Sequence, residues 1–264
     1  DNAIIRKREM KWLQSLGVKG IKVDFFGGDK QETMRLYEDI LSDADDHGLM
    51  VIFHGCTIPR GWERMYPNHM SSEAALVSEN LVFGQYHADK EAQRSTLYPF
   101  IRNAVSAMDF GGVFFNKHFS KDGVSGTLRK TTDAFQIATS VLYQSGIQHF
   151  GITPNNLTEQ PEFILDFMKK VPTVWDETRF IDGYPGKYCA VARRYGNQWY
   201  IAATNATEQP MKLNLSLPWL TNQQVSIIHD NEARTASLSQ GTVNKKGILT
   251  IEMQPMGGAM IYTK

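Results

Sequence analysis

The spacing of apolar and polar positions changes once along the chain, near Pro172. Before that point, helical spacing alternates with short apolar runs that are typical of buried strands. The expected helices are 4–16, 31–47, 91–106 and 133–145, and the expected strands are 18–23, 49–53 and 147–150. Alternating helices and strands predict a parallel α/β sheet, either doubly wound or closed as a (β/α)8 barrel.

After Pro172 the apolar positions follow a period of two, which is typical of half-buried strands. The expected strands are 187–194, 198–204, 211–217, 223–229, 248–253 and 258–263. This pattern predicts a small antiparallel β-sandwich domain over residues 173–264, preceded by an α/β domain over residues 1–172.

The α/β region is short for a closed barrel. It offers about five strands, whereas a (β/α)8 barrel has eight strands in about 250 residues. The chain also begins inside a predicted helix. We therefore expect residues 1–172 to be the C-terminal portion of a barrel whose early strands precede Asp1, with an open five-stranded sheet as the alternative.

Composition excludes two classes of partner. Basic and acidic side chains balance at 28 each, so the chain offers no basic field for nucleic acid. No apolar run approaches the roughly 20 residues that cross a bilayer. The first residues lack the layout of a signal peptide, so the protein is either cytosolic or has lost its leader.

Three carboxylates are candidates for chemistry. Asp24 ends an apolar strand, where parallel α/β enzymes carry their catalytic groups, although it could equally cap a turn or helix. Glu73 and Glu79 follow in one segment and could converge with Asp24 from a loop, or be ordinary solvated charges. Hydrolysis of a glycosidic bond needs two carboxylates, and a further one suits calcium.

Two basic residues lie close to these carboxylates in the sequence. Lys22 lies two residues before Asp24, so both side chains would point the same way from the strand. We expect Lys22 to pair with Asp24 and to donate to a substrate hydroxyl, or to form a simple ion pair near the strand end. His54 ends the next strand and is either a cleft residue or a structural histidine.

Several segments, taken in order, resemble glycoside hydrolase family 97. They are Lys22–Phe25, Phe53–Gly55, Pro59–Gly61, Arg64–Asn68, Ser72–Ala74 with Glu79, Asn103–Phe110, Val174–Thr178 and Asp182–Gly183. The resemblance implies an N-terminal β-sandwich, a central (β/α)8 barrel and a small C-terminal β domain. This chain would then hold the later barrel strands and the C-terminal domain.

The resemblance also implies roles for individual residues. Inverting α-glucosidases of the family carry a glutamate base directly after the histidine that matches His54, whereas retaining α-galactosidases lack it. Here Gly55 follows, so Asp24 is expected to be the nucleophile and Glu79 the general acid/base. Glu73 and Glu79 would bind calcium, and Lys22 and His54 would bind sugar hydroxyls.

The resulting expectation is a retaining, calcium-dependent, exo-acting α-galactosidase, located in the periplasm by family resemblance. Its substrate would be an oligo- or polysaccharide with terminal α-galactose. Its partners in the full-length protein would be the N-terminal β-sandwich and the early barrel strands. Alternatives are a retaining glycosidase for another sugar such as an arabinopyranoside, an inverting α-glucosidase of the same family, and a non-catalytic carbohydrate-binding or structural fragment.

Overall fold

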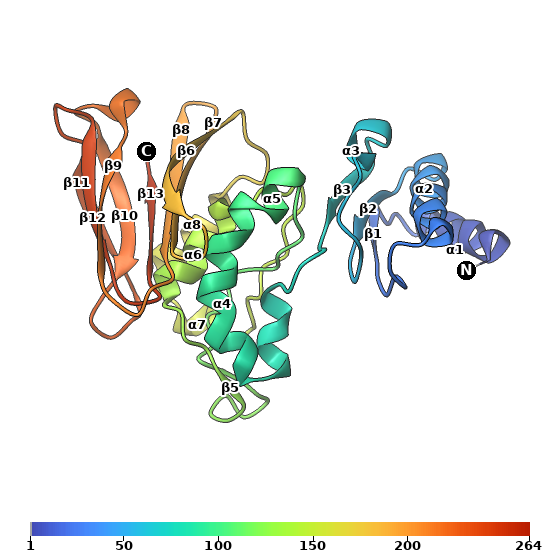
Figure 1. The fold of residues 1–264 in the computed structure, drawn as a ribbon, viewed down its shortest axis with the longest axis horizontal. Helices are drawn as coiled ribbons and strands as arrows, with labels where there is room; N and C mark the ends of the chain where they lie inside the picture. The colour runs from blue at the N-terminus through green and yellow to red at the C-terminus, as the bar shows by residue number, and fades with distance from the viewer. Residues whose placement is uncertain (1) are drawn as a thin grey trace. The chain divides into compact units, whose positions relative to one another are not determined.

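The computed structural model describes residues 2–264, which form two compact units (Figure 1). Unit one contains the residues up to 75 together with 102–109 and 145–147. Unit two contains residues 76–101, 110–144 and 148–264. Each unit has its own hydrophobic core.

Unit one is built on a parallel three-stranded sheet in the order β1-β2-β3. An isolated parallel bridge between Ser72 and Met108 adds one further step to its edge. The elements are α1 (Ala3–Ser15), β1 (Gly20–Val23), α2 (Gln31–Asp46), β2 (Met50–Phe53), α3 (Trp62–Met65), β3 (His69–Ser72) and α5 (Arg102–Val105).

The core of unit one follows from its apolar spacing. Helix α2 buries Tyr37, Ile40 and Leu41, which recur at helical spacing, against a β2 strand that is apolar on both faces. The Tyr37 ring stacks on Phe26 at 4.1 Å between centroids and also contacts Phe53. This aromatic cluster includes Phe53, the last residue of β2.

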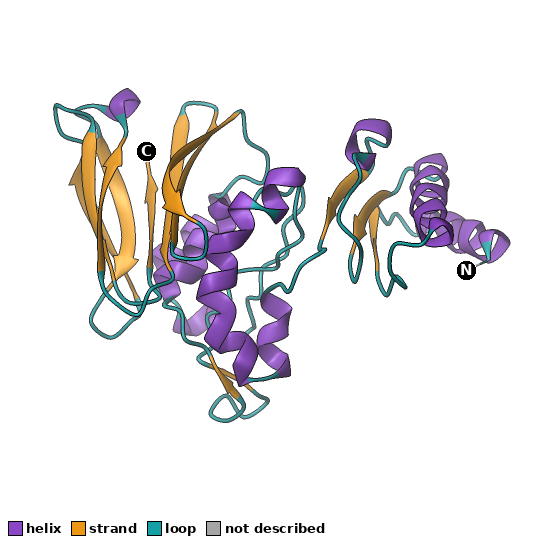
Figure 2. Cartoon of the chain, in the orientation of Figure 1, coloured by secondary structure: helices purple, strands orange, loops and turns teal. Residues whose placement is uncertain are grey.

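Unit two is built on a six-stranded antiparallel sheet in the order β11-β10-β13-β8-β7-β6, with a second sheet of β12 and β9 (Figure 2). Its strands are β4 (His118–Phe119), β5 (Thr127–Leu128), β6 (Glu177–Tyr184), β7 (Tyr188–Tyr195), β8 (Gln198–Asn205), β9 (Met211–Ser216), β10 (Gln224–Asp230), β11 (Ala236–Thr242), β12 (Ile248–Met253) and β13 (Gly258–Tyr262). Its helices are η1 (Ser78–Phe83), α4 (Gln85–Leu97), η2 (Tyr98–Phe100), α6 (Asp133–Leu142), α7 (Asn156–Glu159), α8 (Glu162–Lys170) and η3 (Pro218–Leu220).

The six-stranded sheet is covered on both faces. Ile201 and Ala203 of β8 pack toward Leu215 and Ile251 of the small sheet, which makes a two-layer sandwich. Helix α6 packs on β8 and β13 from the opposite side, so β8 is buried along nearly its whole length. The helix comes so close that a Cβ on Gly258 would lie 2.7 Å from the Phe135 Cα.

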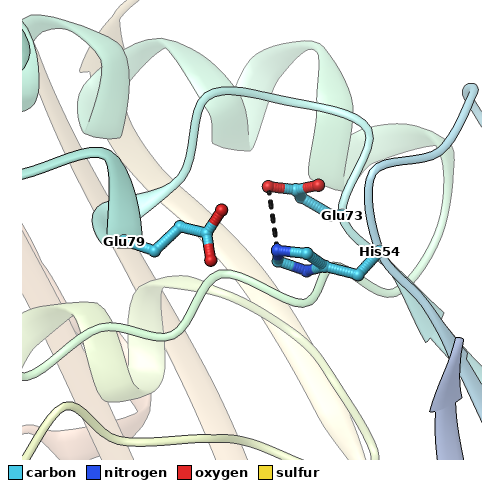
Figure 3. Close-up of side chains that lie close together, drawn as sticks. All are labelled: His54, Glu73 and Glu79. Atoms are coloured by element: carbon cyan, nitrogen blue, oxygen red, sulfur yellow. Dashed lines mark ion pairs between the residues drawn. The ribbon is translucent and has the colours of Figure 1, made fainter. Parts of the chain in front are cut away.

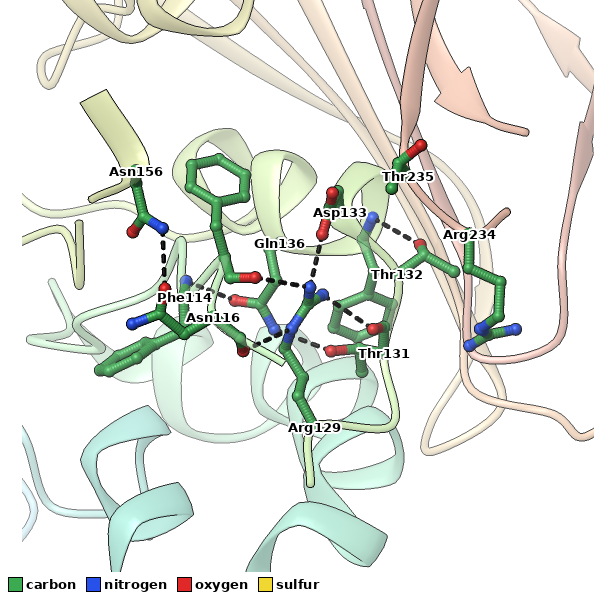
Figure 4. A network of polar contacts seen from close by, with 12 residues as sticks. Phe114, Asn116, Arg129, Thr131, Thr132, Asp133, Gln136, Asn156, Arg234 and Thr235 are labelled. Carbon is green, nitrogen blue, oxygen red and sulfur yellow. Dashed lines mark hydrogen bonds and ion pairs between the residues drawn. The ribbon is translucent and has the colours of Figure 1, made fainter. Parts of the chain in front are cut away.

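Buried polar contacts fasten α6 to the segment that precedes it (Figure 4). Arg129 donates to the carbonyls of Phe115 and Thr131 and pairs with Asp133 in the first turn of α6. Gln136 donates from its side-chain nitrogen to Glu91 at 2.6 Å. These bonds satisfy groups that would otherwise be buried without partners.

Most elements predicted from the sequence are confirmed, and several further elements were not predicted. The expected helix 91–106 is confirmed only in part. Helix α4 covers its first residues and ends at Leu97, because Pro99 cannot continue an α-helix and a short 3₁₀ turn follows, and α5 covers Arg102–Val105. The expected strand 147–150 is wrong, since these residues form neither a strand nor a helix. Strands β3, β4, β5, β6 and β11 were not predicted, nor were the helices α3, α7 and α8.

The parallel sheet with alternating helices agrees with the expected α/β class, and the antiparallel sandwich agrees with the expected second architecture. Closure of the parallel strands into a (β/α)8 barrel and the domain boundary at residue 172 stay predictions. Within residues 2–264, no helix is both long and apolar enough to cross a membrane.

Candidate functional site

Polar side chains follow each parallel strand of unit one at the same edge of the sheet. Asp24, His54 and Glu73 come directly after β1, β2 and β3, and Asp109 follows the bridge at Met108. The backbone ladder continues through them: the His54 N–H donates to the Val23 carbonyl at 2.8 Å and the Glu73 N–H to the Phe53 carbonyl at 2.8 Å. The strands therefore fix the spacing of these four residues.

The turn after β1 holds the Asp24 carboxylate against Gly55. Oδ1 of Asp24 accepts the N–H of Phe25 at 2.6 Å, and Phe25 has a left-handed backbone with φ of 67°. The N–H of Phe26 then donates to the Gly55 carbonyl at 3.0 Å, which ties this turn to the end of β2. The Asp24 side chain is exposed at the sheet edge.

Gly55 has a left-handed backbone conformation that favours glycine. Its φ is +51°, and a Cβ built on it would lie 2.5 Å from Oδ1 of Asp24 and 3.1 Å from the Phe25 nitrogen. A side chain at position 55 and the Asp24 carboxylate therefore compete for the same space.

His54 and Glu73 form a buried pair in the site. Nε2 of His54 lies 3.4 Å from Oε1 of Glu73, as Figure 3 shows. The other carboxylate oxygen of Glu73 accepts the Gly55 N–H at 2.7 Å. The Glu73 carboxylate therefore contacts His54 and Gly55, the first two residues after β2.

Asp109 joins the two basic residues of the site. One of its carboxylate oxygens lies 2.7 Å from Nζ of Lys22 and 3.1 Å from Nδ1 of His54. Asp109 is 2% exposed, so its charge is screened little by water. Lys22 does form an ion pair, but its carboxylate partner is Asp109 and not Asp24, the partner expected from the sequence.

Asp109 was not predicted to act in the site, although its position after an apolar stretch is visible in the sequence. An apolar stretch ending at Met108 is followed at once by a carboxylate, as Val23 is followed by Asp24. The strand itself amounts to a single bridge, which no periodicity can reveal.

Arg102 holds the segment that carries Asp109 against β3. Its buried guanidinium donates to the carbonyls of Ser72 at 2.6 Å, Glu73 at 2.9 Å and Ala107 at 3.1 Å. Burial lowers the pKa of Arg102 below its usual value. These bonds occupy backbone acceptors on both sides of the site, so Arg102 sets the distance between the chain at Glu73 and the chain at Asp109.

Glu79 belongs to unit two. It is an exposed residue of η1, and the neighbouring Ser78 hydroxyl donates to the Phe110 carbonyl at 2.8 Å, which anchors the start of that turn. Unit one thus gathers Lys22, His54, Glu73 and Asp109 in direct contact. The pairing of Asp24 with Glu79 stays a prediction.

Two family models match the chain. Residues 3–75 match the model for glycoside hydrolase 97, and residues 174–264 match the model described as glycosyl-hydrolase 97 C-terminal, oligomerisation. A probable retaining alpha-galactosidase from Streptomyces bingchenggensis is 35% identical over 227 residues, which are 84% of this chain and 33% of the relative. A retaining alpha-galactosidase from Bacteroides thetaiotaomicron is 28% identical over 260 residues, covering 94% of this chain and 39% of the relative.

Solved structures give a similar result. A crystal structure of a beta-arabinopyranosidase is 60% identical with a TM-score of 0.96, covering all of this chain and 42% of its own. A glycoside hydrolase family 97 enzyme from Pseudoalteromonas sp. strain K8 shares the fold at 23% identity, with a TM-score of 0.83 and coverage of 98% and 44%. The chain spans less than half of each of these proteins.

Proposed function

The chain belongs to glycoside hydrolase family 97, and we propose that it carries the nucleophile and the acid/base of a retaining glycosidase. The observation that carries this proposal is the contact between Asp24 and Gly55. A base directly after His54 would need a side chain at position 55, and a Cβ there would lie 2.5 Å from the Asp24 carboxylate. With glycine at that position, the carboxylate that faces the substrate is Asp24, which supports a nucleophile and disfavours an inverting α-glucosidase.

The proposed reaction has two displacements. An oxygen of Asp24 attacks the anomeric carbon while Glu79 gives its proton to the departing oxygen, which leaves a covalent glycosyl-enzyme. Glu79 then takes a proton from water, whose oxygen attacks the same carbon and releases Asp24. Lys22 donates hydrogen bonds to sugar hydroxyls in both steps. His54 lies beside it with its two ring nitrogens facing Asp109 and Glu73, and its binding of a sugar hydroxyl stays a prediction.

Calcium is proposed as the bound metal, with Glu73 and Glu79 as protein ligands. Calcium prefers oxygen ligands, and the Glu73 carboxylate lies at the strand-end edge beside the predicted sugar-binding residues. Bound calcium would supply positive charge near the departing group. Chelation with EGTA is expected to lower the activity of the full-length enzyme, and calcium is expected to restore it.

Two sugars fit the comparisons. β-L-Arabinopyranosides and α-D-galactopyranosides share the configuration of the ring hydroxyls, and the latter adds a hydroxymethyl group. The 60% identity to a beta-arabinopyranosidase favours the arabinopyranoside, and the names of two curated relatives favour the galactoside. Because discrimination on one such group is about 10- to 200-fold, we expect activity on both, with the arabinopyranoside preferred.

The test uses the full-length enzyme with nitrophenyl β-L-arabinopyranoside and α-D-galactopyranoside. The ratio of the two kcat/KM values decides the substrate, and NMR of the first product decides the stereochemistry, with retention expected. Asp24→Asn should abolish turnover, whereas Asp29→Asn, an exposed aspartate on the same loop, should not. Inverted product, or full activity of Asp24→Asn, would overturn the proposal. No activity on any glycoside would favour the non-catalytic alternative.

A further inference from the structure

We propose that Asp109 is a positioning residue that orients Lys22 toward the sugar and holds His54 against the Glu73 carboxylate. The inference rests on the proposed function, because it assigns a role through two residues predicted to bind substrate. Asp109 lies outside the set of residues predicted from the sequence to act in the site. The evidence for its role is one carboxylate oxygen that lies 2.7 Å from Nζ of Lys22 and 3.1 Å from Nδ1 of His54.

The geometry makes Asp109 the fixed member of this group. It is 2% exposed, and its backbone N–H donates to the Ser72 carbonyl at 2.9 Å, so it is held by the end of β3. Arg102 donates to the carbonyl of Ala107, two residues earlier, which restrains the same segment from its other side. The carboxylate therefore has a defined position before any ligand arrives.

The position of the Lys22 ammonium depends strongly on this fixed carboxylate. Its side chain is 38% exposed, and a lysine has a flexible four-carbon stem whose ordering is costly in entropy. One of the three ammonium hydrogens is directed at Asp109, and the other two are available as donors. Without Asp109 the ammonium would sample many positions, and binding would have to fix it.

His54 is oriented by the same oxygen. A carboxylate facing Nδ1 makes this nitrogen a hydrogen-bond donor and fixes the plane of the ring. Because Nδ1 and Nε2 lie on opposite sides of the imidazole, Nε2 is thereby directed toward the Glu73 carboxylate. A single buried carboxylate thus sets the direction of both basic groups.

The alternative is that Asp109 serves only to stabilise the fold. Unit one contains a matched comparator, Asp43, which is also buried and is contacted by two cations, Arg6 at 2.6 Å and Lys7 at 3.0 Å. Asp43 lies in α2, away from the strand ends. A substitution of Asp43 therefore reports the cost of losing a buried, doubly paired aspartate without changing the site.

The experiment measures kcat and KM of the full-length enzyme for Asp109→Asn, Lys22→Met, the double variant and Asp43→Asn. We expect Asp109→Asn to raise KM at least tenfold, because binding must then order Lys22 and His54. Lys22→Met should cost much less in the Asp109→Asn background than in the native one. Asp43→Asn should leave KM within twofold, and its effect should multiply with that of Lys22→Met.

The outcomes separate the two proposals. Native kcat and KM in folded Asp109→Asn, or independent effects of Asp109→Asn and Lys22→Met, would mean that Asp109 only stabilises the fold and would overturn the inference. If Asp109→Asn does not fold, Asp109→Glu keeps the charge but shifts the carboxylate by one methylene. A native KM in that variant would equally overturn positioning. Full activity of Asp24→Asn would instead overturn the proposed function.

Discussion

Placing a single methyl group on Gly55 tests the position of the proposed nucleophile. In Gly55→Ala the new Cβ would lie 2.5 Å from Oδ1 of Asp24, and ordinary contact begins near 3.4 Å. The carboxylate must therefore move by about 0.9 Å. A displacement of about 1 Å at a reacting group costs on the order of 10²-fold in rate, so we expect kcat/KM to fall by about two orders of magnitude.

The same substitution also strains the backbone, because φ of Gly55 is +51°. A left-handed conformation costs an L residue roughly 1–2 kcal/mol, so some loss of stability is expected as well. Gly48→Ala is the matched control, since its φ is +63° and no atom lies within 4 Å of its Cβ position. The two variants should lose similar stability, measured by thermal unfolding, while Gly48→Ala keeps native kcat/KM.

The assay is steady-state hydrolysis of the preferred nitrophenyl glycoside by the full-length enzyme at equal concentrations of folded protein. Native kcat/KM in folded Gly55→Ala would refute the reasoning, because the Asp24 carboxylate could then move by nearly an ångström without consequence. Equal losses in Gly55→Ala and Gly48→Ala would also refute it, since backbone strain alone would explain them.

Three further predictions concern stability. Arg102→Met should destabilise unit one by roughly 3 kcal/mol or more in urea unfolding, because several buried carbonyls lose a charged donor; an unchanged midpoint would contradict this. Burial raises the pKa of Glu91, so the native state keeps its proton to higher pH and stability should decline as pH rises above the usual value of 4.5. Glu91→Gln should flatten that decline in a series of thermal melts, and an identical slope would count against it. Lys212→Ala should leave the melting temperature unchanged, because its pair with Glu252 is exposed.

Local patterns in the sequence predict much of this fold. The spacing of Tyr37, Ile40 and Leu41 marks α2, and the apolar run before His54 marks β2, since each pattern records which face is buried. Strand β9 is predicted for the same reason, because alternate residues face the sandwich core. In each of these elements, the pattern of buried residues that predicts it lies within the element itself.

Other elements depend on partners far away in the sequence. Strand β3 has the sequence His69–Ser72, which is mostly polar, and it forms because Val51 and Ile52 of the buried neighbouring strand supply its ladder. The bridge at Met108 is shorter still. The role of Asp109 depends on that bridge, so residue types alone could place Asp24, His54 and Glu73 at strand ends but could not reveal the carboxylate that contacts both Lys22 and His54.

The way the site is attached to the sheet bears on where substrate preference is encoded. Asp24, His54, Glu73 and Asp109 each follow a strand or bridge, and His54, Glu73 and Asp109 each donate a backbone N–H to the strand before. A change in their spacing would require a shift in strand register, which would also turn buried apolar side chains to the wrong face. The loops beyond these residues are under no such constraint. A relative that prefers an arabinopyranoside and one that prefers a galactoside should therefore differ in loop residues that surround the hydroxymethyl group, while the strand-end residues stay the same.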